Sequence, residues 1–247
     1  MAHFYLVDDL TEAVAGSTVT VTGAEARHAV TVSRVRVGEQ LTLGDGRGTV
    51  VRGEVTEATG DRLSLVAATV TAHPRPGVRI ALAQALAKGD RDELAVQAAT
   101  ELGVDEVVPW SASRSVSRWE GAKVAKGTSR WRAITREATK QAIRPWAPEV
   151  LDLATTKQLA ARTALGPVLV LEPTADRALS AVDLPPEGGA GSVVTVVVGP
   201  EGGVSTAELA LFVDAGATLA RLGDSVLRTS TAGPAALAVL SVRLGRW

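Results

Sequence analysis

The chain has 247 residues, 46% of them hydrophobic, with 26 lysine and arginine side chains against 27 acidic ones. This length allows one large domain or two ordinary ones. The absence of cysteine excludes disulfides and thiolate chemistry, and the three histidines lack metal-ligand spacing, so we expect no metal. No apolar run reaches the roughly 18 residues of a membrane span and no leader pattern is present, so we expect a cytoplasmic protein with no membrane contact.

Short strands and tight turns are predicted up to about residue 70. The alternating patterns at 3–7, 17–22, 39–46, 49–58 and 62–70 favour a small β-barrel or sandwich. One helix interrupts them, beginning near Ala24 and including Arg27 and His28. The segment LGDGRG lies between two strand patterns with no helix after it, so a hairpin turn is favoured over a dinucleotide-binding loop.

The pattern changes after residues 72–77, where two prolines and a glycine indicate a linker. We therefore predict domains at 1–72 and 77–247. Strands alternate with helices in the second domain, which predicts βαβ units and a parallel sheet. Strands are expected at 79–87, 104–110, 149–153, 168–172, 193–198 and 218–222, helices at 90–102 and from about Thr231 and Pro234, and a surface loop at 185–192.

The most informative stretch is VVTVVVGPEGGVSTAELA at 193–210, where a buried-strand pattern stops at a glycine-rich turn that opens into a helix. Glycines lack a Cβ, so the backbone amides of such a turn can approach a ligand closely. Ser205 and Glu208 predict a capping box that fixes where the helix begins. No Walker lysine and no GxGxxG pattern is present. On these residues alone, a ligand-binding loop and a plain strand-to-helix connection both stay open.

A second strand-end loop, LGDSVLRTSTAGP at 222–234, also leads into a helix. Ligands of open parallel sheets lie beyond the carboxyl ends of the strands, so two such loops predict a pocket. The alternative for its threonines and serine is ordinary turn and cap chemistry.

Residues 111–150 carry nine basic side chains and three acidic ones. Within them Arg132, Arg136, Lys140 and Arg144 recur every four residues, which predicts one stripe on a helix. Like charges at this spacing destabilise a helix by roughly 0.2 to 0.5 kcal/mol per pair, and an anionic partner would relieve the repulsion between them. The segment therefore favours contact with nucleic acid over a solvated charged face. Pro145 directs Arg144 away from helical geometry, so this arginine is expected to project from the helix end.

Taken together, these motifs resemble the RsmE-type 16S ribosomal RNA uridine-N3 methyltransferases, members of the SPOUT superfamily. The most specific matches are VVVGPEGGVSTAE at 196–208 and LGDSVLRTSTA at 222–232, with others at 28–39, 84–104, 113–116 and 136–144. The resemblance implies an N-terminal PUA-like RNA-binding β-barrel and a C-terminal α/β SPOUT domain whose parallel sheet carries a trefoil knot. It also implies a homodimer that uses S-adenosylmethionine to methylate N3 of a uridine in the decoding region of 16S rRNA in the small ribosomal subunit.

Site residues follow from the matching motif positions. The resemblance places cofactor contacts at Leu171, Gly199, Pro200, Gly202, Gly203, Leu222, Gly223, Leu227 and Arg228. The expected RNA contacts come from the charge pattern, in the basic segment 111–150 and around His28, which Arg27, Arg34 and Arg36 surround. They are Arg27, His28, Arg34, Arg36, Arg114, Arg132, Arg136 and Lys140. Ser225 and Ser230 stand where the family often has an arginine and a glutamate, and Lys140 and Ala142 replace residues of its EQSxR pattern. Roles of the missing residues do not transfer.

The reaction requires removal of the uridine N3 proton, and a nearby cation would stabilise the resulting uridine anion. Arg144 and Arg228 are the candidate cations, and Glu137 is the candidate base, with solvent hydroxide as its alternative. Two other functions stay open. One is a SPOUT methyltransferase acting on a ribose 2′-hydroxyl or on transfer RNA, and the other is a noncatalytic RNA-binding factor of ribosome assembly.

Overall fold

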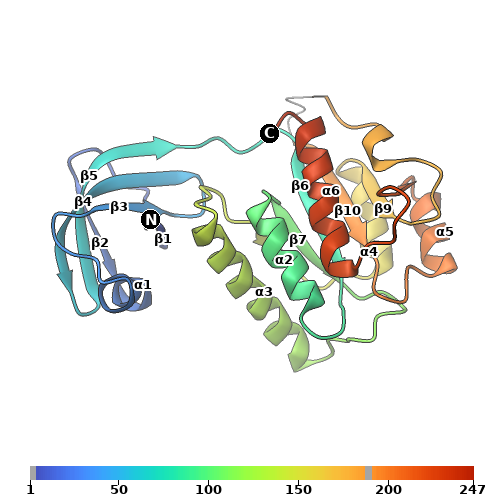
Figure 1. The fold of residues 1–247 in the computed structure, drawn as a ribbon, viewed down its shortest axis with the longest axis horizontal. Coiled ribbons are helices and arrows are strands. Elements are labelled where there is room, and N and C mark those ends of the chain that lie inside the picture. The colour runs from blue at the N-terminus through green and yellow to red at the C-terminus, as the bar shows by residue number, and fades with distance from the viewer. Residues whose placement is uncertain (1–3, 187–190) are drawn as a thin grey trace. The chain divides into compact units, whose positions relative to one another are not determined.

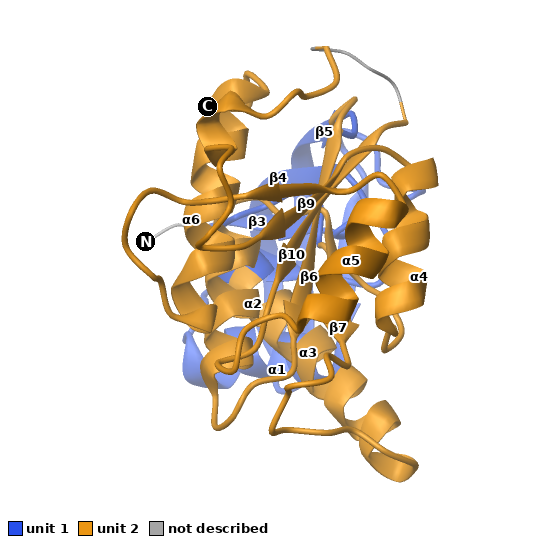
Figure 2. Cartoon of the chain, turned by 90° about the vertical axis from the view of Figure 1, so that its right-hand side faces the viewer, with its two compact units in different colours: residues 1–75, 139–147 blue, residues 76–138, 148–247 orange. Residues whose placement is uncertain are grey.

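The computed structural model describes residues 4–186 and 191–247, so His3 and residues 187–190 of the predicted surface loop lie outside the described residues. The chain divides into two compact units (Figure 2). Unit 1 comprises Met1–Arg75 and Thr139–Ala147, and unit 2 comprises Pro76–Ala138 and Pro148–Trp247. The division after residue 75 lies inside the predicted linker, but the return of 139–147 to unit 1 was not predicted from the sequence.

Unit 1 is built on a five-stranded sheet in the order β1-β3-β4-β5-β2 (Figure 1). Its strands are β1 (Phe4–Leu6), β2 (Thr18–Thr22), β3 (Gln40–Gly44), β4 (Thr49–Thr59) and β5 (Arg62–Ala72). β1 pairs in parallel with β3, and the other neighbours are antiparallel. Apolar side chains such as Leu43, Val51 and Leu65 form its core, which confirms the alternating strand patterns of this half of the sequence.

Two local features of unit 1 agree with the sequence. The β3–β4 connection is a hairpin whose turn is fixed by Asp45, because Asp45 Oδ1 accepts hydrogen bonds from the backbone N–H groups of Arg47 (2.7 Å) and Thr49 (3.0 Å). The predicted helix is α1 (Gly23–Arg27), which continues into one π-helical turn, His28–Val32. Ala26 and Ala29 bury one side of this turn in the core, so the intervening Arg27 and His28 are exposed.

Unit 2 contains a six-stranded sheet in the order β11-β9-β10-β6-β7-β8, and every neighbouring pair is parallel. The strands are β6 (Arg79–Ala85), β7 (Glu106–Trp110), β8 (Glu149–Val150), β9 (Val168–Leu171), β10 (Val193–Val198) and β11 (Thr218–Ala220). All six residues of β10 are buried, because helices cover both faces of the sheet. The prediction of a parallel α/β sheet is confirmed.

The helices of the second half are α2 (Arg91–Glu101), α3 (Ala122–Gln141), α4 (Thr156–Ala160), α5 (Thr206–Asp214) and α6 (Thr229–Arg243), with short 3-10 turns at Ala161–Ala164 and Leu179–Ala181. Figure 2 shows α2 and α6 on one side of the sheet and α4 and α5 on the other. Alternate residues of β6 follow this arrangement: Leu82 packs with Leu237 of α6, whereas Ala83 belongs to the cluster around Phe212 of α5. Within the described ranges, no helix is long and apolar enough to cross a membrane.

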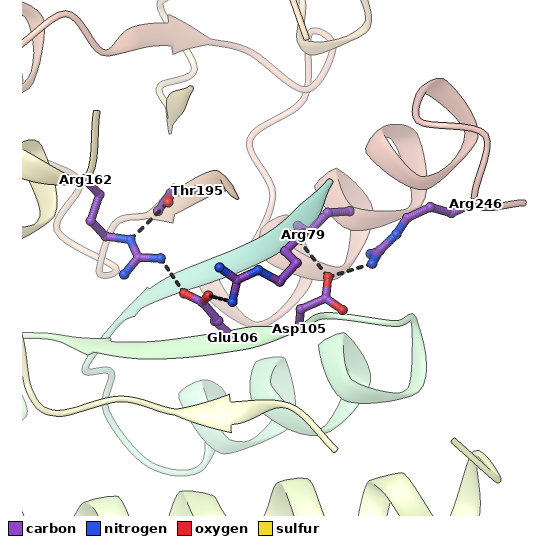
Figure 3. Close-up of polar contacts among 7 residues, drawn as sticks. Arg79, Asp105, Glu106, Arg162, Thr195 and Arg246 are labelled. Atoms are coloured by element: carbon purple, nitrogen blue, oxygen red, sulfur yellow. Dashed lines mark hydrogen bonds and ion pairs between the residues drawn. The ribbon is translucent and has the colours of Figure 1, made fainter. Parts of the chain in front are cut away.

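Buried ion pairs close the amino edge of this sheet (Figure 3). Glu106, at the start of β7, accepts hydrogen bonds from Arg79 Nη1 (2.7 Å) and Arg162 Nη2 (2.5 Å). The neighbouring Asp105 accepts one from Arg246 Nη2 (2.6 Å). The two carboxylate side chains are only 8% and 9% exposed, so each needs its cation. The amino edge is therefore a structural region of the domain.

The end of α3 differs from the stripe pattern. The helix stops at Gln141, and the N–H of Arg144 donates to the carbonyl of Thr139 (3.0 Å). Ile143 takes φ +52°, the left-handed conformation that closes such helix ends and usually belongs to glycine. The prediction that Arg144 continues the helical stripe is therefore wrong, because Arg144 lies beyond the end of the helix. The projection of its side chain from the helix end stays a prediction.

Replacing Ile143 with glycine should stabilise the chain. A left-handed conformation costs an L-residue about 1 to 2 kcal/mol, and glycine avoids this cost. Glycine also has a larger conformational entropy in the unfolded chain, which offsets roughly half of the stabilisation. We expect a rise in the thermal unfolding midpoint of roughly 1 to 4 °C by scanning calorimetry. Ala142→Gly is the matched control, since Ala142 has no positive φ and its replacement should lower the midpoint. A lower midpoint in both variants would contradict the strain at Ile143.

Candidate functional site

A cavity of about 400 Å³ lies at the carboxyl ends of three adjacent strands of unit 2, β11, β9 and β10. Three chain segments supply most of its wall, and each directly follows one of these strands. They are residues 171–173 at the end of β9, residues 199–201 and 203 of the GPEGG turn after β10, and residues 222, 223 and 225–229 after β11, joined by Arg91 of α2. The two glycine-containing loops that the sequence singled out therefore meet in one cavity, at the edge where parallel sheets bind ligands.

A buried chain of hydrogen bonds joins these loops to the sheet. Gln84, at the end of β6, is fully buried and its Nε2 donates to Thr229 Oγ1 (2.8 Å). Thr229 Oγ1 in turn donates to the backbone oxygen of Gly199 (2.9 Å), the first residue of the GPEGG turn. Thr229 is the first residue of α6, which begins two residues before the predicted start at Thr231. One hydroxyl thus connects β6, the GPEGG turn and α6.

The downstream end of the GPEGG loop is fixed on a buried carboxylate. Ser205 and Glu208 form the predicted capping box. Glu208 Oε1 also accepts from Ser113 N–H (2.8 Å) and Thr156 Oγ1 (3.0 Å), and its Oε2 accepts from the hydroxyls of Ser113 and Ser205 (both 2.7 Å). Burial alone would raise the pKa of Glu208, but these hydrogen bonds outweigh it and lower the pKa to about 2. Glu208 is therefore ionised, and it ties the loop at Ser113 and the start of α4 to the start of α5.

Charged groups also stand at the cavity itself. Glu201 Oε1 accepts from Arg91 Nη1 (3.0 Å) and from Lys88 N–H (3.1 Å). Burial favours a higher pKa for Glu201, but hydrogen bonds from its own N–H, from Lys88 and from Arg91 hold the pKa below its ordinary value. On the other side of the turn, Arg114 Nη1 donates to the carbonyl of Gly202 (3.2 Å). The GPEGG turn is thus held from two sides by cationic side chains.

Close packing explains one glycine of this turn, and backbone conformation explains another. A Cβ on Gly199 would lie 2.8 Å from Val204 Cγ2, which is too close for a real contact. Gly203 has φ +71°, a conformation that side-chain-bearing residues rarely adopt. The compact turn therefore requires glycine at both positions.

Eight of the nine residues expected to contact the cofactor line this cavity, and their cofactor role stays a prediction. Gly202 is absent from the lining residues, and its carbonyl faces Arg114. The sequence analysis did not single out Arg91, Glu172, Glu201 or Thr229, which also line it. Glu201, Thr229 and Arg91 all lie inside segments that match the family, so their position was a usable signal. The pairing of Arg91 with Glu201, 110 positions away, has no local signature in the sequence.

The candidate catalytic residues are distributed over both units. Arg228 lines the cavity and is the N-cap residue of α6. Glu137 lies on α3 in unit 2 and is not among the cavity-lining residues, and Arg144 belongs to unit 1. Their catalytic roles stay predictions.

Most of the candidate RNA contacts are at the surface. The exposed ones are Arg27, His28, Arg34, Arg36, Arg114 and Arg132, and Arg136 is partly exposed. Lys140 differs, because its side chain is only 10% exposed and its Nζ lies 3.2 Å from Glu25 Oε1 of α1. In the part of the chain that the structure describes, no group of three or more His, Asp or Glu side chains could hold a metal ion.

Matches to two known families define the class of this protein, an RNA methyltransferase with an N-terminal PUA domain. A family model described as an RNA methyltransferase domain matches residues 74–241, and one described as an RNA methyltransferase PUA domain matches residues 21–67. The ribosomal RNA small subunit methyltransferase E of Mycobacterium tuberculosis is 42% identical and covers 100% of this chain and 94% of the relative. The ribosomal RNA small subunit methyltransferase E of Bacillus subtilis is 32% identical, and the match covers 91% of this chain and 90% of the relative. The chain belongs to the ribosomal RNA small subunit methyltransferase E family.

A solved structure gives the same result at the level of the fold. The crystal structure of the small-subunit methyltransferase E from Neisseria gonorrhoeae, bound to S-adenosylmethionine, is similar with a TM-score of 0.86 and 26% identity, and the match covers 98% of both chains. Both halves of the chain therefore have counterparts in one solved relative.

Thr229 offers a direct test of the buried hydrogen-bond chain. Thr229→Val keeps the shape but removes the hydroxyl, leaving the Gly199 carbonyl without this donor and the Gln84 amide without this acceptor. We expect a loss of about 1 to 3 kcal/mol in the free energy of unfolding, measured by urea denaturation. Thr229→Ser retains the hydroxyl and should lose clearly less. Equal losses would show that the hydroxyl is not what holds the loops.

The buried Glu208 predicts a pH-dependent stability. Its pKa lies at about 2 in the folded chain against 4.5 ordinarily, so its stabilising effect is complete above pH 4.5 and is lost as the pH falls towards 2. Glu208→Gln should destabilise the chain by about 2 kcal/mol at pH 7, and this difference from the unmodified chain should shrink between pH 5 and pH 2. Glu12→Gln, at an exposed position, is the control and should leave stability unchanged. A pH-independent difference would contradict the assignment.

Proposed function

We propose that this chain transfers the methyl group of S-adenosylmethionine to N3 of a uridine in the decoding region of 16S rRNA. The observation that carries the proposal is the cavity formed by both motif loops at the carboxyl edge of the parallel sheet. Relatives named ribosomal RNA small subunit methyltransferase E support the substrate class, and a relative bound to S-adenosylmethionine supports the methyl donor. The choice of uridine N3 rests on the motif resemblance.

The residues of the cavity fit S-adenosylmethionine. Its volume of about 400 Å³ falls within the roughly 300 to 1,000 Å³ of small-molecule sites. Leu171, Leu222 and Leu227 give apolar walls suited to the adenine ring. The carboxylates of Glu172 and Glu201 stand at the same cavity and complement the positive charge of a sulfonium and an ammonium group. When bound, the cofactor supplies a methyl group on a positively charged sulfur, which is the electrophile of the reaction.

The protein's own contribution is orientation and control of one proton. Ordered loops that hold the reacting groups near attack distance can supply about 7 to 11 kcal/mol of the barrier reduction. The uridine N3 must lose its proton as the new nitrogen–carbon bond forms and the sulfur–carbon bond breaks. We assign Arg144 and Arg228 to stabilise the negative charge that develops on the uracil ring, and Glu137 or solvent hydroxide to accept the proton.

The two domains around this site have separate proposed roles. The exposed basic residues of α1 and of the loop after it are the proposed RNA surface of a PUA-like barrel spanning residues 1–72. We also propose that residues 77–247 form the SPOUT domain with a trefoil knot. After the 222–229 loop, α6 packs on β10, β6 and α2, and the knot itself rests on the motif resemblance. A cytoplasmic homodimer follows from the resemblance.

Two measurements test the function. Calorimetry should detect S-adenosylmethionine binding, and small ribosomal subunits from cells lacking the gene should gain a methyl group on uridine N3, detected by mass spectrometry of the rRNA.

Arg144→Ala should lower kcat by about 100-fold or more and leave cofactor affinity within a factor of about two. Arg62→Ala, on an exposed side chain of the same unit, is the control.

Each alternative has its own outcome in these measurements. No cofactor binding would favour the noncatalytic RNA-binding factor. A methyl group found on a ribose oxygen or in transfer RNA would favour the other SPOUT activities. Full activity of Arg144→Ala would remove this arginine from the mechanism.

A further inference from the structure

We infer that unit 1 is the positioning device for Arg144, so that the RNA-binding unit, and not the methyltransferase unit, holds this cation in place. The inference rests on the proposed role of Arg144. It starts from the observation that Thr139–Ala147 packs as part of unit 1, although it directly follows most of α3 in unit 2. Two sets of contacts, one on each side of Arg144, hold the segment there.

The first set joins the residues after Arg144 to the β3–β4 hairpin. Gly48 N–H donates to the carbonyl of Pro145 (3.0 Å), and Ala147 N–H donates to the carbonyl of Gly46 (2.9 Å). Between these two bonds, Arg47 and Trp146 form an antiparallel β-bridge. The hairpin therefore pairs with the segment as a short extra strand would.

Trp146 anchors this pairing with its side chain. Its Nε1–H donates to the carbonyl of His73 (2.9 Å), and the guanidinium carbon of Arg75 lies 4.6 Å from the ring centroid. Gly48 makes room for the ring, since a Cβ there would lie 2.5 Å from the ring carbon Cζ2 and 2.7 Å from the His73 oxygen. Gly48 also has φ +103°, so both its conformation and its missing side chain are required here.

The second set lies before Arg144. Lys140 Nζ is 3.2 Å from Glu25 Oε1, and their side chains are only 10% and 18% exposed. A pair this buried is held more firmly than a surface ion pair. Next to Arg144, Ile143 keeps its left-handed backbone, a strained state that persists only where the surroundings enforce it. Arg144 therefore sits between two fixed points, with its backbone direction set by both.

This arrangement gives one unit two tasks. Glu25, which pairs with Lys140, belongs to α1, the same helix that presents the exposed Arg27 and is followed by His28. RNA bound on α1 and the guanidinium of Arg144 would be held by the same small sheet. The register of the bound RNA would then determine which uridine meets the cation.

The test uses Gly48→Ala, which pushes on the Trp146 ring without touching Arg144 itself, with the full chain, S-adenosylmethionine and small ribosomal subunits from cells lacking the gene. Gly16→Ala is the matched control in unit 1, because Gly16 also has a positive φ (+88°) but has no atom within 4 Å of an added Cβ. Trp146→Phe, which keeps a ring but loses the bond to His73, replaces Gly48→Ala if that variant does not fold. The readouts are kcat, the cofactor Kd and the pH dependence of kcat.

We expect Gly48→Ala to lower kcat by at least about tenfold, with the cofactor Kd within about twofold of the unmodified chain. A cation within about 4 to 6 Å of the uracil favours its deprotonated form and lowers the pKa of N3 by about 1 to 3 units. Displacing the Arg144 guanidinium removes this effect, so the midpoint of the pH–kcat profile should rise by about 1 to 3 pH units. Gly16→Ala should change neither. A purely structural role of Gly48 would lower the melting temperature and leave the pH profile in place.

Two results separate failure of this inference from failure of the proposed function. If Arg144→Ala is inactive while Gly48→Ala and Trp146→Phe both behave like Gly16→Ala, unit 1 does not position the cation, and the inference is overturned with the function intact. If Arg144→Ala is fully active, the role of Arg144 is wrong and the inference goes with it.

Discussion

The hydroxyl of Thr229 is the interaction on which the site depends. It accepts a hydrogen bond from the fully buried Gln84 and donates one to the Gly199 carbonyl. It therefore connects the GPEGG turn and the start of α6 to β6, one of the two central strands of the sheet. An isolated glycine-rich turn could take many conformations. Here its first carbonyl is fixed by Thr229 and its far end by the Glu208 network, so the cavity between the loops is preorganised.

The two edges of the large sheet use charge differently. At the amino edge Glu106 is shared by Arg79 and Arg162, and both oxygens are engaged within the protein. At the carboxyl edge the cavity is lined by Glu172, Glu201, Arg91 and Arg228, of which Arg91 is about half exposed. Arg91 and Glu201 also pair with each other (3.0 Å), but their side chains are 46% and 27% exposed and line an open cavity, where a ligand can reach them. The cavity and its accessible charges therefore favour the carboxyl edge as the functional one.

The parts of this molecule that could be predicted from the sequence are those that depend on residues close together in the chain. The β10 strand, the GPEGG turn and the Ser205–Glu208 capping box follow from local pattern and spacing, and the structure contains all of them. The pairs Arg91–Glu201 and Lys140–Glu25 join residues more than 100 positions apart, so no periodicity could reveal them. The charge stripe failed at Arg144 for a local reason, because a β-branched residue, Ile143, occupies a left-handed position that sequence patterns assign to glycine.

Lys140 illustrates how burial can change what a charged residue does. The charge spacing predicted a contact with RNA, yet the lysine lies against Glu25 with little exposure. A lysine held in this way offers less to a phosphate than an exposed one, since its charge is already compensated. What it contributes is a tie between α1 and the end of α3. The cavity belongs to unit 2, whereas Arg144 and the Lys140–Glu25 pair belong to unit 1. On the proposed function, the fit of the RNA to unit 1 would therefore contribute to the choice of uridine beside the cavity itself.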